Sequence, residues 1–169
     1  MSIPRTLLLD TNIWVSFFFE PDTSHDETVR FMEAAIRSHA TLAYTASTLK
    51  DVFYIVPRRV RAQAIAEGFD VDAATFVPIA WACVETMTEL AVAVGQSLPE
   101  CHMAWMLRNE HPDLEDNLIF AAAETSNVDY VVTYDRQMLK HFSPACITPA
   151  QALRLWELGQ WGLAASAHV

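Results

Sequence analysis

Near its start the chain reads Thr6-Leu7-Leu8-Leu9-Asp10-Thr11-Asn12, a short apolar run that stops abruptly at an acid. A continuous apolar run of this length is typical of a strand that is buried on both faces of a parallel sheet. Asp is disfavoured in strands, so Asp10 marks the end of this one. In open parallel sheets, ligands bind at the carboxyl ends of the strands. The stretch therefore predicts a buried strand followed by an acid at a binding edge.

The rest of the sequence alternates between short apolar strands and helical patterns, which indicates an α/β layer fold around a parallel sheet. Residues 58–110 have a mostly helical pattern with no obvious strand. We expect a single domain over residues 1–160, with 58–110 as a helical elaboration inside it and 161–169 as a frayed tail. The predicted strands cover residues 41–44, 128–133 and 145–147, and the predicted helices cover about 25–38, 45–56 (closed by Pro57), 112 onward, 136–141 and 149 onward.

Composition and charge exclude several classes of protein. Of the 169 residues, 52% are hydrophobic and 19% are charged, so the chain has enough apolar surface to fold. Apolar runs fall short of the ~20 residues that span a bilayer, and the first residues lack a signal-peptide layout. We expect a soluble, cytoplasmic protein. The formal net charge of −10 disfavours nonspecific binding of polyanions, although each bound divalent cation would cancel two negative charges locally.

Four aspartates are expected to meet at one edge of the sheet. Asp10 and Asp135 each follow a buried strand. Asp51 lies in the first turns of the helix after the second strand, and Asp116 lies near the start of the helix that precedes residues 128–133. Because crossover helices begin near the carboxyl ends of parallel strands, all four carboxylates can point at one small volume. Asp113, three residues before Asp116, would bring a fifth carboxylate close.

These acids also have a structural interpretation. Asp10 and Asp135 can simply cap the next helix or turn, and the helix dipole favours Asp113 and Glu115 in a first turn, which we prefer for Glu115. Four like charges without compensation would shift the carboxyl pKa values strongly upward. A hard divalent cation such as Mg²⁺ or Mn²⁺, which prefers oxygen ligands, relieves that repulsion. Such a site hydrolyses phosphodiesters without a nucleophilic Ser, Cys or His.

The strand and helix segments that carry these acids, in their order along the chain, resemble those of PIN-domain ribonucleases, including the VapC-type toxins of bacterial toxin–antitoxin pairs. The second segment of that family usually carries Glu where this chain has Asp51, and Asp116 is the acid of the third. The segments that carry the resemblance are Leu7–Ile13, Thr45–Asp51, Asp113–Ala123, Val131–Asp135 and Ile147–Pro149.

This resemblance implies a Rossmann-like three-layer α/β/α PIN domain with a short central parallel sheet. It also implies endoribonuclease activity that depends on Mg²⁺ or Mn²⁺, frequent homodimers and, for a toxin, an antitoxin protein as partner. Thr11 and Asn12 would orient Asp10, and Thr133 would support the same site. The metal ligands that it implies are Asp10, Asp51, Asp116 and Asp135, with Asp113 as a fifth candidate.

Other features leave alternatives open. The basic cluster of Arg58, Arg59 and Arg61 is a candidate for gripping RNA phosphates, with a solvated helix start as an interpretation of at least equal weight. Asp10 could instead be the nucleophile of an aspartyl phosphohydrolase. Against that, Asn12 stands where haloacid-dehalogenase-like phosphatases commonly carry a second acid. The third alternative is a noncatalytic binding module of the same fold.

Overall fold

Five parallel strands form the central sheet of the computed structural model, which describes residues 5–69 and 72–157. Their order across the sheet is β3-β2-β1-β4-β5. In β1, Leu7 is in register with Leu42 on one side and with Tyr130 on the other, so β1 lies at the centre. The strands are β1 (Thr6–Leu9), β2 (Thr41–Thr45), β3 (Ala91–Val94), β4 (Tyr130–Val132) and β5 (Cys146–Ile147).

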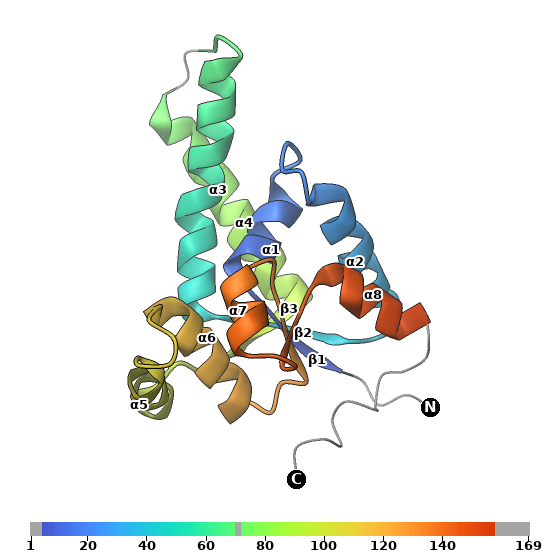
Figure 1. Cartoon of the computed structure of the whole chain (residues 1–169). Coiled ribbons are helices and arrows are strands. Elements are labelled where there is room, and N and C mark those ends of the chain that lie inside the picture. Colours follow the sequence, from blue (N-terminus) through green and yellow to red (C-terminus); the bar gives the residue numbers. More distant parts are fainter. Residues whose placement is uncertain (1–4, 70–71, 158–169) are drawn as a thin grey trace.

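Helices cover both faces of this sheet and make three layers (Figure 1). Side chains alternate along β1, so Leu7 and Leu9 enter one apolar core and Leu8 enters the other. The Leu7 and Leu9 side is covered by α1 (Thr11–Phe18), α2 (His25–Arg37), α8 (Pro149–Glu157) and the inner parts of α3 (Ala46–Ala66) and α4 (Val77–Leu90), and the Leu8 side by α5 (Leu98–Leu107), α6 (Leu114–Thr125) and α7 (Arg136–His141). The predicted α/β/α architecture is confirmed.

A helix that the sequence analysis did not predict, α1, begins directly after Asp10. The carboxylate of Asp10 accepts a hydrogen bond from the backbone N–H of Thr11, which caps the N-terminus of α1. One acid therefore ends a strand and begins a helix that the apolar pattern alone did not indicate. The predicted helix over 136–141 agrees with α7, whereas the strand predicted over 128–133 is shorter, at Tyr130–Val132.

Two predictions for the middle of the chain are wrong. Pro57 does not close a helix, because α3 continues through it to Ala66, held by the packing of Val56 and Val60 against the core. Residues 58–110 are not purely helical, because β3 lies inside them as an edge strand of the sheet. Ala91–Val94 is an apolar run, but it follows the last residue of α4 directly, so no turn residue separates the strand from the helical pattern before it. As an edge strand β3 is only partly covered, and Val92 is 52% exposed.

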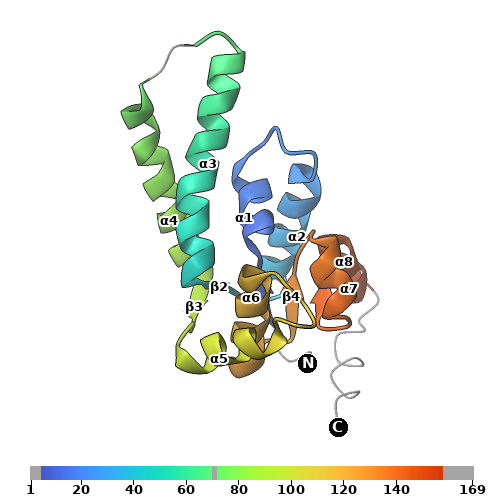
Figure 2. The ribbon, with the colours of Figure 1, turned by 60° about the vertical axis from the view of Figure 1, so that its left-hand side comes forward.

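The outer part of α3, the short 3₁₀ helix η1 (Ala73–Phe76) and the start of α4 project from the body as an arm, which we define as residues 54–69 and 72–81 (Figures 1 and 2). The arm exposes several large apolar side chains, a pattern that marks interaction surfaces. They are Tyr54, Ile65, Phe69, Val77 and Trp81. Within the described residues no helix is long and apolar enough to cross a membrane. The tail predicted over 161–169 lies outside those residues.

Candidate active site

The acids lie near the centre of the sheet, where the connections that follow two adjacent strands run to opposite faces. Helix α1 follows β1 onto one face, and α7 follows β4 onto the other, so a crevice opens between these adjacent strands at their carboxyl ends. Such a switch point is where open α/β sheets bind ligands. Asp10 starts α1 and Asp135 starts α7, so the two acids stand on either side of the crevice.

Asp10 is the most buried of these acids, with 6% of its surface exposed. One carboxylate oxygen accepts from the N–H of Thr11 at 2.6 Å. The other accepts from the hydroxyl of Thr133 at 2.6 Å and from the amide of Asn12, which also donates to Thr133 Oγ1 at 3.0 Å. Burial raises the pKa of Asp10, and these hydrogen bonds partly oppose the shift. Thr11, Asn12 and Thr133 therefore fix the orientation of Asp10.

Asp113 and Asp135 each precede a helix, and each uses one carboxylate oxygen to cap it. Oδ1 of Asp135 accepts from the N–H groups of Gln137 and Met138, and Oδ1 of Asp113 accepts from those of Glu115 and Asp116. The capping role considered from the sequence is thus present. In each case the second oxygen has no hydrogen-bonded partner among the described side chains, so it remains available to a ligand.

Five acids line one pocket of about 390 Å³, which we call the carboxylate pocket: Asp10, Asp22, Glu115, Asp116 and Asp135, of which Asp22 is paired with Arg59. Partial burial, followed by the charges of Asp113, Asp10 and Asp135, raises the pKa of Asp116 to about 6, against an opposing effect of His111. Thr11 also lines the pocket, and its buried hydroxyl has no partner within the described structure. The pocket thus concentrates negative charge that the folded chain itself does not neutralise.

Of Asp51 and Glu115, only Glu115 is among the residues that line the carboxylate pocket. Asp51 does not line the carboxylate pocket; its carboxylate is 2.9 Å from Lys50 Nζ and interacts with the side chain of Glu115. Burial and that contact with Asp51 raise the pKa of Glu115 to about 7, although the side chain is largely exposed and solvent screens the effect. Glu115, interpreted from the sequence as a helix-dipole acid, is therefore an additional candidate. The signal available was its position one residue before Asp116.

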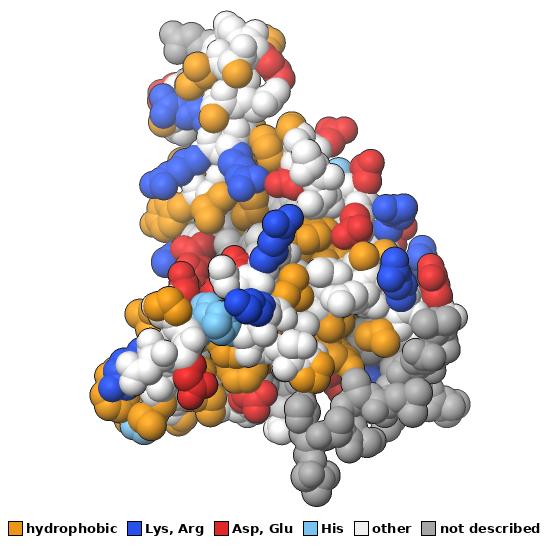
Figure 3. Space-filling model, in the orientation of Figure 1, with side chains coloured by type: hydrophobic (Ala, Val, Ile, Leu, Met, Phe, Trp, Pro, Cys, Tyr) orange, Lys and Arg blue, Asp and Glu red, His pale blue; other side chains and the backbone are white. Residues whose placement is uncertain are grey.

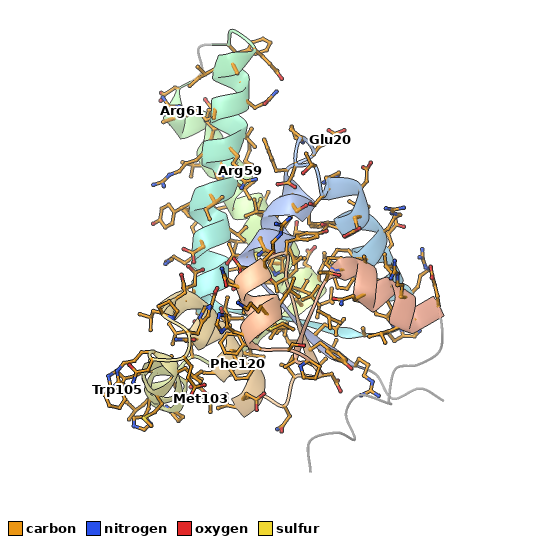
Figure 4. The ribbon with its side chains drawn as sticks, viewed as in Figure 1. Glu20, Arg59, Arg61, Met103, Trp105 and Phe120 are labelled. Atoms are coloured by element: carbon orange, nitrogen blue, oxygen red, sulfur yellow. The ribbon has the colours of Figure 1, made fainter. Side chains whose placement is uncertain are left out.

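Of the three arginines, Arg59 alone is among the residues that line the carboxylate pocket. Its guanidinium lies 3.0 Å from Asp22, on the loop between α1 and α2. Figure 4 shows Arg59 on the side of α3 that faces α1, near Glu20 on the same loop, and Arg61 on the opposite side of α3. Arg58 and Arg61 are exposed and line none of the hollows described here.

The chemistry of the donors fits a hard divalent cation. All the acids of the carboxylate pocket offer oxygen, the ligand that Mg²⁺ and Mn²⁺ prefer. Burial, together with the charges of neighbouring carboxylates, raises the pKa values of Asp10 and Asp116, and a bound cation would oppose both effects. Across residues 5–69 and 72–157, however, no three His, Cys, Asp or Glu side chains are already gathered as a metal site.

The fold and the pocket define a Rossmann-like α/β protein with an acidic ligand site at the carboxyl edge of its sheet. The sequence model of the PIN domain matches residues 6–137, which is most of the chain. The chain therefore belongs to the PIN domain family. No curated protein sequence matches it.

Solved structures of toxins share this fold. VapC20 from Mycobacterium tuberculosis, described as a sarcin-ricin loop cleaving toxin, has a TM-score of 0.62 at 13% identity, covering 79% of this chain and 93% of that one. VapBC-1 from nontypeable Haemophilus influenzae has a TM-score of 0.58 at 12% identity, covering 86% and 98%. A toxin–antitoxin complex from Klebsiella pneumoniae has a TM-score of 0.55 at 18% identity, covering 85% and 97%. At these identities the likeness is one of fold.

Proposed function

We propose that this protein is an endoribonuclease that depends on Mg²⁺ or Mn²⁺ and acts as the toxin of a toxin–antitoxin pair. The observation that supports this most is the convergence of Asp10, Asp116 and Asp135 on one pocket at the switch point of the sheet. No nucleophilic side chain is needed for phosphodiester hydrolysis at such a site. RNA as substrate is supported by membership of the PIN family and by the sarcin-ricin loop cleavage named for the similar VapC20.

Within this proposal the chain supplies a prepared anionic site. Asp10, Asp116 and Asp135 would hold the cation, with Glu115 and Asp113 beside them, and Thr133 and Asn12 keep Asp10 in place. A bound divalent cation lowers the pKa of a water and stabilises the charge of the scissile phosphate. Arg59, which also lines the pocket, would hold a neighbouring phosphate of the RNA.

The geometry of Asp10 favours hydrolysis by water over attack by the carboxylate. Both of its oxygens accept hydrogen bonds, from Thr11 on one side and from Thr133 and Asn12 on the other. These bonds draw electron density from the carboxylate and restrict its approach to a phosphorus atom. A role as ligand and charge suits this environment better than a role as nucleophile.

The proposed partners follow from the relatives and from the arm. Toxin–antitoxin complexes are among the similar structures, and an antitoxin of this chain would cover apolar surface that the fold leaves open. Tyr54 and Trp81 on the arm are both more than half exposed. Self-association through apolar surface of this kind is the basis for proposing a homodimer as well.

The test is cleavage of labelled RNA and DNA strands by the purified chain with EDTA, Mg²⁺ or Mn²⁺, beside calorimetric titration of each ion. We expect RNA cleavage with either ion, none with EDTA, and loss of both cleavage and ion binding in Asp116→Asn. Asn cannot supply the charge, although the fold is retained because Asp116 is not a helix cap. Ion binding without cleavage would favour the noncatalytic module, and trapping of an acyl phosphate on Asp10 would favour the phosphohydrolase.

A further inference from the structure

Three adjacent hollows run from the carboxyl edge of the sheet along α6 and α7. The carboxylate pocket shares Asp116 and Asp135 with a middle hollow of about 400 Å³, which Asp113 and Gln137 also line. The middle hollow shares His111 and His141 with a third, of about 540 Å³. We call this third one the aromatic hollow. The aromatic hollow therefore lies within reach of an extended ligand that occupies the carboxylate pocket.

Four aromatic rings line the aromatic hollow; His141 is exposed and Phe120 is half-buried, and both lie against the buried rings of His111 and Phe142. Phe120 of α6 and Phe142, which follows α7, stack with their ring centroids 4.2 Å apart, and His111 lies 5.2 Å from Phe142 and 5.1 Å from His141. Figure 4 shows Phe120 below α7, on the side of the sheet that α5 and α6 cover. Surfaces of this kind bind the faces of unstacked nucleic-acid bases, which is how single-stranded RNA is read by many proteins.

The charge of the aromatic hollow selects a base over a phosphate. Glu110 and Glu124 line it, and both side chains are exposed at its rim. Carboxylates repel the RNA backbone, but they accept hydrogen bonds from the amino groups of bases. In Figure 3 acidic and apolar side chains lie around a histidine side chain at the lower left of this face of the molecule. The hollow thus combines stacking surface, apolar walls and acceptors.

We propose that the aromatic hollow is a subsite for one RNA base next to the scissile phosphate, and that it selects an amino-bearing base against uracil. The inference rests on the proposed ribonuclease function. Adenine, cytosine and guanine carry an amino group that Glu110 or Glu124 accepts from, whereas uracil has a single N–H and no amino group. The shared residues His111 and His141 set the subsite close to Asp116 and Asp135, where the backbone would be cut.

The test sequences the ends produced from a single-stranded RNA pool that is randomised at every position. For the wild type we expect one position beside the cut to exclude uracil, by about 5-fold or more. An oligonucleotide that is abasic at this position should be cut about 5- to 150-fold more slowly than its parent, the range that base stacking gives. The double variant Glu110→Gln/Glu124→Gln should cut with weaker discrimination, because an amide donates as well as accepts.

The matched control is Glu85→Gln/Glu89→Gln, which removes the same charge from exposed positions of α4 that line none of the three hollows. It should keep the preference of the wild type. Cleavage without base preference, equal cutting of the abasic strand, or an unchanged preference in the Glu110→Gln/Glu124→Gln variant would each overturn the subsite while leaving the ribonuclease standing. Absence of any RNA cleavage by the wild type would overturn both.

Discussion

Charged side chains are usually exposed in a folded protein and apolar ones are usually buried, and two regions of this molecule depart from that pattern in opposite ways: the carboxyl edge of the sheet and the arm. The edge buries charge, with Asp10 only 6% exposed and Asp116 and Asp135 beside it. The arm exposes apolar surface, with Trp81 59% exposed. Each arrangement lowers stability in the isolated chain, one through desolvation and repulsion and the other through hydration of apolar groups. Under the proposed function, the two regions would bind different partners, a cation at the edge and a protein surface on the arm.

The largest expected effect is on catalysis and separates the two regions. Asp10→Asn should reduce RNA cleavage by at least about 100-fold, since charge stabilisation of several kcal/mol is removed. Tyr54→Ser/Trp81→Ser on the arm should leave cleavage near the wild-type rate and shift the chain toward monomer in light scattering. Circular dichroism would establish that all variants are folded. Loss of cleavage in the arm variant, with cleavage retained in Asp10→Asn, would contradict the assignment of catalysis to the carboxyl edge.

A smaller effect should distinguish the two acids that meet between α3 and α6. Glu115→Gln is expected to slow cleavage by roughly 10-fold, because Glu115 lines the carboxylate pocket, and Asp51→Asn by less, because Asp51 reaches the pocket only through Glu115. Rates at saturating Mg²⁺ and the apparent Mg²⁺ affinity would be measured for both. A larger defect in Asp51→Asn would restore Asp51 as the ligand that the sequence predicted.

Arg59 and Arg58 offer a matched pair on the same helix. Arg59→Ala should raise KM several-fold and reduce the slope of log KM against log salt by about one, as expected for one lost phosphate contact. Arg58→Ala, which removes the same charge outside the pocket, should change neither. KM would be measured between low and moderate salt. Equal slopes for the two variants would mean that Arg59 does not touch the RNA.

The smallest effect is on stability and comes from the raised pKa of Asp116. Its contribution to the free energy of unfolding is fully present below the ordinary pKa of 3.8 and is lost as the pH rises through about 6. Without divalent ions, the free energy of unfolding of Asp116→Asn at pH 8 should therefore exceed that of the wild type by an amount on the order of 1 kcal/mol. This difference, measured by thermal unfolding, should shrink toward pH 4. If the difference in the free energy of unfolding between the variant and the wild type did not depend on pH, it would contradict the destabilisation of the charged form of Asp116 in the folded protein.

Much of the fold follows from local patterns. The run that ends at Asp10 and the helix after Asp135 are visible in the sequence because apolar burial and helix capping act over a few residues. The continuation of α3 through Pro57 and the strand Ala91–Val94 are not, because both depend on neighbours that are distant in the sequence. Whether Asp51 or Glu115 enters the pocket likewise depends on how α3 and α6 lie together.

The capping acids have a consequence for how such a chain changes over generations. Asp10 and Asp135 each begin a helix through an oxygen that Asn also carries, and Asn is as good a cap as Asp. The codons for these two amino acids differ by one nucleotide. Under the proposed function, a single nucleotide change at Asp135 would therefore remove a ligand of the cation while α7 keeps its cap, so that loss of activity need not involve loss of the fold.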